Sequence, residues 1–444
     1  MKQILVLGAG LSAKSLIDYF LNHAKEYNWH ITLADLDKAV AQRKIGNSPF
    51  GTAIGLDVKN DKAIAELIHE KDVVVSLLPA SFHDKIAEEC IRQGVNMATA
   101  SYVSPAMKSR DEEIKAKGLT FLNELGVDPG IDHMSAMQVI DKIRLKGGHL
   151  TSFYSFTGGL IAPECDTNPW HYKFTWNPRN VVLAGQGVSQ FIKNGKYKYI
   201  PYHKLFDRII EREVLDYGRF EIYPNRDSLK YRKLYQLDDI RSMFRGTMRR
   251  PGYAEAWNVF VQLGCTDDTY TLEESETMTY REFINTFMRY NPGKPVEEKL
   301  VEYLDLDPQG EVMKKLTWLG IFEDRVIGIP LATPAQILQK LLEEKWALSP
   351  DDKDMIVMQH EFEYELLNKS YQIISSMVFK GKDTVDTAMA FTVGTPLAIA
   401  VKLLLNGQIS TKGVLIPTKA ELYNPILKEL KDYGINFVEK ELLN

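Results

Sequence analysis

The chain of 444 residues has few cysteines, no strong excess of charge and no long uninterrupted apolar run. Its three cysteines, Cys90, Cys165 and Cys265, are far apart and form no CxxC pair, which argues against a disulfide framework or a zinc ribbon. With 54 Lys and Arg against 59 Asp and Glu, the net charge is −5, too balanced to draw the chain to nucleic acid or anionic lipid. We therefore expect reduced thiols, and neither a nucleic-acid nor a membrane partner.

The most apolar long segment, residues 388–405, is interrupted by Gly394, Pro396 and Lys402. A membrane span needs about 20 uninterrupted apolar residues, so this segment is predicted to be buried in a protein core. The first residues lead directly into a strand-like run without a signal-peptide pattern, and we expect a cytoplasmic protein. The apolar share of 45% and the charged share of 25% are typical of soluble globular proteins.

Short apolar runs alternate with amphipathic helical patterns over residues 1–125. The runs at 4–7, 31–34, 73–78, 95–98 and 119–122 are continuous, as expected of strands that are buried on both faces. This rhythm predicts an α/β fold that begins with a Rossmann domain, a doubly wound parallel sheet. Aromatic-rich strands and loops follow up to residue 230, then a mainly helical segment over 231–345. A strand-like stretch near 355–379 and a helix beginning at Thr395-Pro396 suggest that the chain then returns to the earlier domains.

A glycine motif, Gly8-Ala9-Gly10-Leu11-Ser12-Ala13, lies between the first predicted strand and an amphipathic helix. In this context Gly8 permits a tight turn, Gly10 lets a pyrophosphate approach the backbone, and Ala13 allows close helix packing. The N–H groups at the helix start then face the phosphate charge. The motif predicts a nicotinamide dinucleotide site.

Asp35 ends the second predicted strand, 25 residues after Gly10. A carboxylate there accepts hydrogen bonds from the adenosine ribose and repels a 2′-phosphate. We therefore expect NAD, with NADP as the alternative. Lys38 and Arg43 follow closely enough to offset that repulsion, but solvated helix charges are their simpler interpretation.

Polar residues also follow later strands of the predicted sheet, where ligands bind in open α/β folds. One strand is followed by Ser101-Tyr102-Val103-Ser104-Pro105, and another by Asn123-Glu124 and Asp128-Pro129-Gly130, although Asp-Pro-Gly is also common turn chemistry. Further along, Arg226, Arg245 and Arg249 are candidate carboxylate clamps, because a guanidinium grips a carboxylate through two bonds. Ordinary surface arginines are the alternative. The histidines show no ligand spacing, and we expect no metal site.

Taken together, these motifs resemble the saccharopine dehydrogenases that form L-glutamate, also called saccharopine reductases. The matching runs are Gly8-x-Gly10, 75–79, 82–83, TASYVSPAM (99–107), NELGVDPGIDHM (123–134), GGLIAPE (158–164), 168–169, 172–176, YPNRDS (223–228), RGT (245–247), 318–322 and 400–402. They span nearly the whole chain in the right order.

The resemblance implies three interleaved domains and a homodimer. The Rossmann domain is expected at 1–125 with about 390–444, an α/β substrate-binding and dimerisation domain at 126–230 with about 346–389, and a helical domain at 231–345. The implied reaction oxidises saccharopine to an imine, which water splits into L-glutamate and 2-aminoadipate 6-semialdehyde, or runs in reverse, in lysine metabolism.

The resemblance also implies the site residues. The substrate contacts are Ser101, Tyr102, Asp128, Arg226, Gly246 and Thr247. The cofactor contacts are Gly8, Gly10, Leu11, Ser12, Asp35, Asp57, Leu78, Val127 and Trp176. Among them Asp128 is the first candidate for polarising water or moving protons, and Tyr102 the second.

Two departures from the family pattern matter. Thr157-Gly158-Gly159 stands where the family often has Cys-Gly-Gly, so no thiol can act at that position. Asp35-Leu36 stands where NADP-using relatives carry an arginine, which strengthens the preference for NAD. NAD use in turn fits lysine breakdown better than synthesis. The alternatives are a related enzyme acting on carboxynorspermidine or lysine, and a sensor that binds NAD without turnover.

Overall fold

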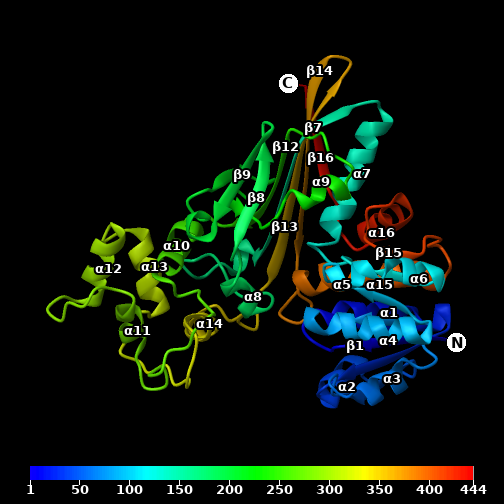
Figure 1. The fold of residues 1–444 in the computed structure, drawn as a ribbon, viewed down its shortest axis with the longest axis horizontal. Coiled ribbons are helices and arrows are strands. Elements are labelled where there is room, and N and C mark those ends of the chain that lie inside the picture. Colours follow the sequence, from blue (N-terminus) through cyan, green and yellow to red (C-terminus); the bar gives the residue numbers. More distant parts are fainter. Residues whose placement is uncertain (444) are drawn as a thin grey trace. The chain divides into compact units, whose positions relative to one another are not determined.

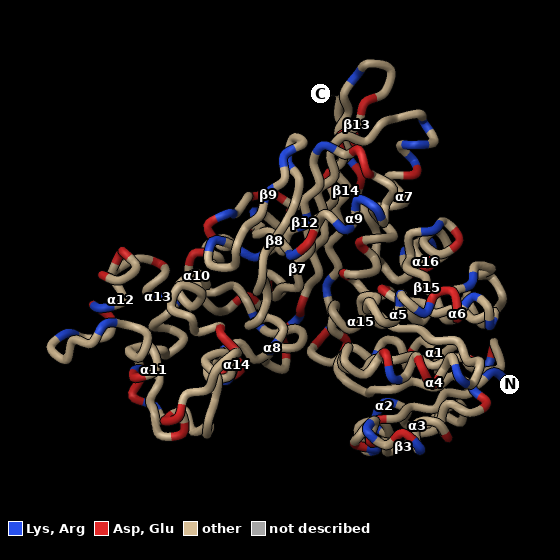
Figure 2. Tube along the Cα trace, in the orientation of Figure 1, with Lys and Arg blue, Asp and Glu red and all other residues tan. Residues whose placement is uncertain are grey.

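The computed structural model describes residues 1–443, which divide into two compact units (Figure 1). Unit 1 contains Met1–His149 and Met377–Val438, and unit 2 contains Leu150–Ser376 and the residues from Glu439 on. Each unit is built on its own sheet. Lys and Arg are interspersed with Asp and Glu along both units (Figure 2), as the balanced composition predicts.

Unit 1 contains a seven-stranded sheet in the order β15-β6-β5-β4-β1-β2-β3. All these strand pairs are parallel. The strands are β1 (Lys2–Leu7), β2 (Trp29–Asp35), β3 (Gly51–Gly55), β4 (Val73–Ser76), β5 (Asn96–Thr99), β6 (Thr120–Leu122) and β15 (Gly413–Leu415). The five apolar runs of the sequence lie in or overlap β1, β2, β4, β5 and β6, so the predicted Rossmann fold is confirmed.

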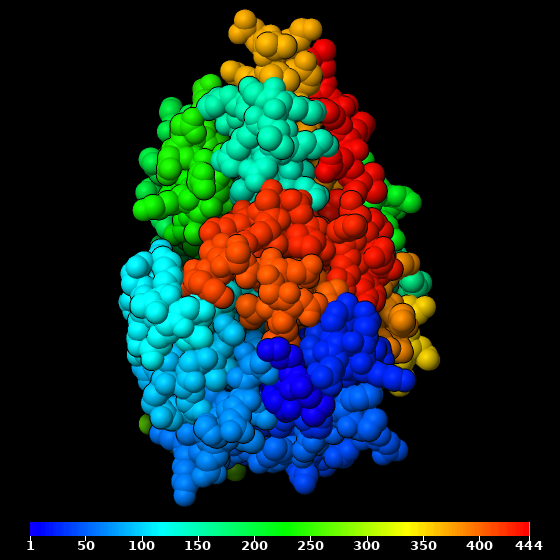
Figure 3. Space-filling view, turned by 90° about the vertical axis from the view of Figure 1, so that its right-hand side faces the viewer, coloured from blue at the N-terminus to red at the C-terminus, as the bar shows by residue number. Residues whose placement is uncertain are grey.

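The helices of unit 1 alternate with these strands. They are α1 (Ala13–Tyr27), α2 (Lys38–Ile45), α3 (Asp61–Ile68), the 3₁₀ helix η1 (Ala80–Phe82), α4 (His83–Gln93), α5 (Pro105–Ser109), α6 (Asp111–Ala116), α7 (Ile131–Leu145), α15 (Ala388–Leu405) and α16 (Ala420–Asp432). Figure 3 shows the surface of the C-terminal segment, orange to red, next to the blue N-terminal residues. The segment Met377–Val438 returns to the first unit.

Helix α15 is long and apolar enough to cross a membrane by composition alone, yet 67% of it is buried inside the protein. It packs on α1 and α16, and a Cβ atom at Gly394 would lie 2.9 Å from the Leu16 nitrogen of α1. The predicted core segment is therefore confirmed. Its predicted start at Thr395 is wrong, because the Thr387 hydroxyl accepts a hydrogen bond from the Ala390 N–H group and begins the helix earlier.

Unit 2 is built on a nine-stranded sheet with the path β10-β11-β12-β7-β13-β14-β16, to which β8 and β9 are added beside β12. The strands are β7 (His149–Ile161), β8 (Val188–Lys193), β9 (Lys196–Pro201), β10 (Ile210–Glu213), β11 (Arg219–Pro224), β12 (Ser242–Arg249), β13 (Asp354–Leu366), β14 (Lys369–Lys380) and β16 (Val438–Leu443). The helices are η2 (Pro163–Cys165), α8 (Pro178–Val182), η3 (Tyr202–Lys204), α9 (Lys230–Leu234), α10 (Tyr253–Leu263), α11 (Tyr280–Thr286), α12 (Val296–Leu304), α13 (Glu311–Leu319) and α14 (Pro334–Lys345).

The structure divides the chain differently from the expected three domains. Residues 126–149, which include α7, belong to unit 1 rather than to the second domain. The tyrosine hydroxyl of Tyr423 on α16 donates to Asp141 on α7 at 2.7 Å, which ties the two helices together. The segment 231–345 lies in the same unit as the second sheet and is not helical throughout. Its residues Ser242–Arg249 form β12, a strand that pairs with β11 and β7 and is almost wholly buried.

Candidate active site

The glycine motif forms the turn between β1 and α1. The Gly8 N–H group donates to the Ala34 carbonyl at 2.8 Å, and the φ angle of Gly8 is +100°. A Cβ atom on Gly8 would lie 3.0 Å from the Leu77 carbonyl oxygen, so a side chain is excluded by both conformation and space. At Gly10 a Cβ atom would meet nothing within 4 Å, which leaves open backbone for a ligand.

The start of α1 suits an anion. Within the described residues 1–443, no backbone carbonyl accepts a hydrogen bond from the N–H groups of Gly10, Leu11 or Ser12. The Ser12 side chain makes no capping bond, and Leu11 is 75% exposed. Because α1 is 15 residues long, its dipole adds to these donors. The turn therefore fits the pyrophosphate of a dinucleotide.

The Asp35 carboxylate is held beside this turn. Its Oδ2 atom accepts a hydrogen bond from the Ala9 N–H group at 2.7 Å, and its Oδ1 atom accepts one from Asp37 at 3.1 Å. The side chain is partly buried at the end of β2. Two backbone donors thus fix the carboxylate where the ribose of a bound dinucleotide is expected.

Two further cofactor candidates, Asp57 and Leu78, follow the strands β3 and β4 of the same sheet. Asp57 is exposed just beyond β3, and its Oδ1 atom accepts from the Lys59 N–H group at 2.9 Å. Leu78 follows β4 next to Leu77, whose N–H group donates to the Leu7 carbonyl at 2.8 Å. The structure therefore brings Gly8, Asp35, Asp57 and Leu78 to the carboxyl edge of one parallel sheet.

The two candidate catalytic residues are close to each other. Tyr102 follows β5, and its hydroxyl donates a hydrogen bond to the Asp128 carboxylate at 3.3 Å. Tyr102 is 39% exposed and Asp128 is partly buried, whereas the adjacent Val127 is buried. A phenol and a carboxylate in contact can pass a proton between themselves and a substrate.

Two buried polar residues lie behind these loops, His83 and Glu124; Glu124 was singled out by its position after a strand, whereas His83 was not predicted as a site residue. His83 lies between two serines: its Nδ1 atom is 2.9 Å from Ser76 Oγ, and its Nε2 atom is 2.8 Å from Ser101 Oγ. Burial lowers the pKa of this imidazole. The run that contains His83 matched the family, but no pattern in the sequence showed its contact with Ser101.

Glu124 is the second residue. Its N–H group donates to the Ser101 carbonyl at 3.0 Å, and its carboxylate accepts from the Val103 N–H group at 3.1 Å. The same carboxylate is 2.7 Å from Nε2 of His133, which is completely buried. Glu124 thus holds the backbone of the loop that carries Ser101 and Tyr102, and His83 contacts the Ser101 hydroxyl.

The remaining candidates form a separate group in unit 2. In the register of the sheet, Thr247 of β12 lies opposite Tyr223 of β11 and Thr157 of β7, so their side chains share one face. The neighbouring Gly246 lies opposite Pro224. The Thr157 hydroxyl, at the position of the family's cysteine, is a buried oxygen with no hydrogen-bond partner among residues 1–443.

Arg226 and Trp176 lie in loops of the same unit. Arg226 is exposed just beyond β11, and its carbonyl accepts from the Gln190 N–H group at 2.8 Å. Trp176 is partly buried ahead of α8. An exposed guanidinium is available to grip a carboxylate, as the resemblance implies.

The other two candidate clamps are not surface arginines. Arg245 and Arg249 are each only 4% exposed. The Arg245 guanidinium stacks over the Tyr231 ring at 4.1 Å, and that of Arg249 lies 4.9 Å from the Tyr172 ring. Their charges are therefore placed among aromatic rings inside unit 2.

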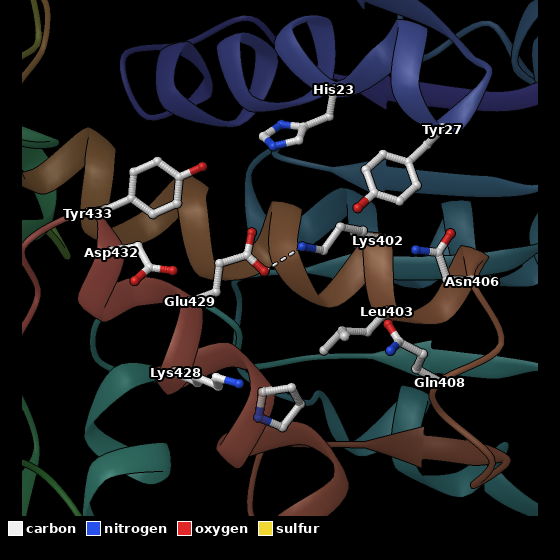
Figure 4. Close-up of a pocket in the computed structure, with 11 residues that line it drawn as sticks. His23, Tyr27, Lys402, Leu403, Asn406, Gln408, Lys428, Glu429, Asp432 and Tyr433 are labelled. Carbon is white, nitrogen blue, oxygen red and sulfur yellow. Dashed lines mark hydrogen bonds and ion pairs between the residues drawn. The ribbon is translucent and has the colours of Figure 1, made fainter.

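A hollow of about 690 Å³ lies elsewhere on unit 1. Figure 4 shows it between α1, α15 and α16, where Lys402 forms an ion pair with Glu429 and His23 and Tyr27 face them from α1. His23 is 13 residues from Gly10 along the chain, so the hollow lies about 20 Å from the glycine turn along α1. None of the candidate site residues lines it.

Comparisons with known proteins identify the family of the chain. Residues 4–122 match the family profile "Saccharopine dehydrogenase NADP binding domain", and residues 126–435 match "Saccharopine dehydrogenase C-terminal domain". The chain is 34% identical to the "Saccharopine dehydrogenase [NADP(+), L-glutamate-forming]" of Saccharomyces cerevisiae, over 99% of both chains. It is also 34% identical to the mouse mitochondrial "Alpha-aminoadipic semialdehyde synthase", covering 98% of this chain and 47% of that protein.

A solved structure of the apo yeast enzyme, "saccharopine dehydrogenase (L-Glu forming)", matches all of this chain with a TM-score of 0.90 and 34% identity. The predicted α/β fold and the predicted nicotinamide cofactor are thus confirmed. The preference for NAD stays a prediction, and the names of the matching profile and of the yeast enzyme favour NADP. By these matches over nearly its whole length, the chain belongs to the saccharopine dehydrogenase family.

Proposed function

We propose that this protein is an L-glutamate-forming saccharopine dehydrogenase that acts in lysine metabolism. The observation that carries the proposal is the contact of the Tyr102 hydroxyl with the Asp128 carboxylate in a chain that matches such an enzyme from end to end. The two residues follow strands of the same sheet that carries the glycine turn. In open α/β sheets this edge is where cofactor and substrate bind.

In the proposed reaction the carbon–nitrogen bond of the secondary amine is oxidised and then hydrolysed. A bound nicotinamide supplies the redox chemistry by accepting a hydride from the carbon next to nitrogen. The amine nitrogen loses its proton, and the resulting substrate imine takes up water. The carbon–nitrogen bond then breaks to give 2-aminoadipate 6-semialdehyde and L-glutamate.

The chain's own residues manage the protons and hold the substrate. Asp128 takes a proton from the attacking water, with Tyr102 as the hydrogen-bonded partner through which a proton is passed or returned. The resemblance to the family assigns a substrate carboxylate to Arg226, because a guanidinium binds a carboxylate through two hydrogen bonds. A threonine hydroxyl is a poor base, so we assign the acid–base work to Asp128 rather than to Thr157.

We further propose that the cofactor is NAD. The support is the Asp35 carboxylate, which two backbone N–H groups hold beside the glycine turn, and the exposed Leu36 that follows it. A 2′-phosphate placed there would meet a negative charge rather than an arginine. The homodimer and the cytoplasmic location stay predictions of the sequence.

Absorbance at 340 nm tests the proposed function. The protein is mixed with saccharopine and either NAD or NADP at mildly alkaline pH, and we expect the reduced cofactor to form, faster with NAD. Carboxynorspermidine and lysine are tested in parallel, and faster turnover of either would transfer the assignment to that substrate. Tight NADH binding without turnover of any of the three would instead favour a sensor.

A further inference from the structure

His83 connects the ends of two strands at the carboxyl edge of the unit 1 sheet. Ser76 ends β4 and Thr99 ends β5, and the two residues are paired in the sheet. His83, the first residue of α4, is 5% exposed. Its Nδ1 atom faces the Ser76 hydroxyl at 2.9 Å, while its Nε2 atom faces the Ser101 hydroxyl at 2.8 Å and the Thr99 hydroxyl at 3.4 Å.

This hydrogen-bond chain runs from the core to the site. Ser76 and Thr99 are buried, whereas Ser101 is partly exposed at the start of the substrate loop. Burial lowers the pKa of His83, which favours the neutral ring. A neutral imidazole has one N–H donor and one acceptor nitrogen. It therefore fixes the direction of the hydrogen bond at each serine hydroxyl.

The rest of the Ser101 loop is already fastened without His83. Glu124 binds the Ser101 carbonyl and the Val103 N–H group, and the Ser104 hydroxyl donates to Asp84 at 2.5 Å. What His83 adds is control of one side chain, the Ser101 hydroxyl. A histidine that served only to fill the core would not need a hydrogen bond to a partly exposed hydroxyl.

We propose that His83 is a positioning residue that holds the Ser101 hydroxyl in the orientation in which it binds saccharopine. This inference rests on the proposed function, because it takes saccharopine as the ligand of Ser101. It assigns His83 to substrate binding rather than to cofactor binding or proton transfer. Loss of the contact should therefore raise the KM for saccharopine and leave the affinity for NADH unchanged.

Two conservative variants distinguish the hydrogen bond of Nε2 from that of Nδ1. In His83→Gln the side-chain amide reaches the position of Nε2 and can still bond Ser101. In His83→Asn it reaches only the position of Nδ1 and keeps the bond to Ser76 alone. We expect the KM of His83→Gln to stay within about twofold of the wild type and that of His83→Asn to rise about fivefold or more, the usual effect of one lost hydrogen bond.

The control and the double variant complete the test. His69→Gln changes a histidine whose side chain is 72% exposed and should leave KM unchanged. Ser101→Ala should raise KM as His83→Asn does, and the double variant should be no worse than Ser101→Ala alone. Melting temperatures and NADH titrations of every variant check that each protein is folded and binds cofactor.

The outcomes are distinct. A wild-type KM in His83→Asn, equal losses in the Asn and Gln variants, or additive losses with Ser101→Ala would each overturn the role of His83 and leave the proposed function standing. A wild-type protein that does not turn over saccharopine would remove the proposed function, and this inference with it.

Discussion

Replacing Asp35 by asparagine tests how the protein chooses between the two nicotinamide dinucleotides. The substitution removes the negative charge but keeps a side-chain oxygen that can accept from the Ala9 N–H group, which donates to Asp35 at 2.7 Å in the structure. The carboxylate is fixed by this bond and by a second one from Asp37 at 3.1 Å. It therefore cannot swing away from a 2′-phosphate without losing both.

The magnitude follows from the charges. Two unit charges about 4 Å apart repel by about 1 kcal/mol in water and about 4 kcal/mol near a protein surface. The 2′-phosphate of NADP carries more than one charge, so about 2 kcal/mol is a lower estimate for the repulsion. Since about 1.4 kcal/mol corresponds to a factor of ten, we expect the wild type to bind NADH about 30-fold more tightly than NADPH. The ratio should fall about tenfold or more in Asp35→Asn.

Fluorescence titration of NADH and NADPH measures both dissociation constants without turnover. Asp72→Asn is the matched control, because Asp72 also accepts a backbone hydrogen bond, from Gln3 at 2.7 Å, but lies before β4 at the opposite edge of the same sheet. Its ratio should equal that of the wild type. Equal affinities of the wild type for the two cofactors, or an unchanged ratio in Asp35→Asn, would refute the role assigned to Asp35.

Three further predictions concern catalysis, packing and pH. Asp128→Asn should lower kcat more than about tenfold while NADH still binds, and near-normal turnover would leave Asp128 as a turn residue only. Lys173 forms a buried ion pair with Asp352 at 2.6 Å. Lys173→Met should lower the free energy of unfolding, measured in urea, by about 3–5 kcal/mol, because it leaves the buried Asp352 charge unpaired. Adding Asp352→Leu removes that charge and should recover most of the loss. Burial lowers the pKa of His83 from 6.5, so below about pH 6.5 the unfolded chain binds a proton that the folded chain does not. The free energy of unfolding should therefore decrease as the pH falls below about 6.5, by at most about 1.4 kcal/mol per pH unit. His83→Leu should show a shallower pH dependence, and an identical one would contradict this reasoning.

Local signals were sufficient for much of unit 1. The run Ile4-Leu5-Val6-Leu7 forms a strand because all four side chains are buried between covering helices. Gly8 follows because the next turn requires a positive φ angle and close approach to Leu77. Such features depend on neighbouring residues in the chain, so their pattern is visible in the sequence. The resemblance supplied the candidate pair Tyr102 and Asp128.

Other features depended on partners far along the chain. The strand β3, Gly51–Gly55, has a weak apolar pattern and is a strand because it pairs with β2. Strand β12 lies in a segment expected to be helical, but pairing with β11 and β7 on its two sides determines its conformation. The sheet register then sets Thr157 beside Thr247, although 90 residues separate them in the numbering.

The sequence by itself therefore determined the Rossmann architecture and the glycine turn, because these follow from local periodicity and turn geometry, while its resemblance to the family supplied the candidate catalytic pair. Only the tertiary structure decided that His83 contacts Ser101 and that Glu124 holds the loop from Ser101 to Val103. Those contacts join residues that follow different strands, and hydrogen bonds between such residues exist only after the sheet has brought the strand ends together.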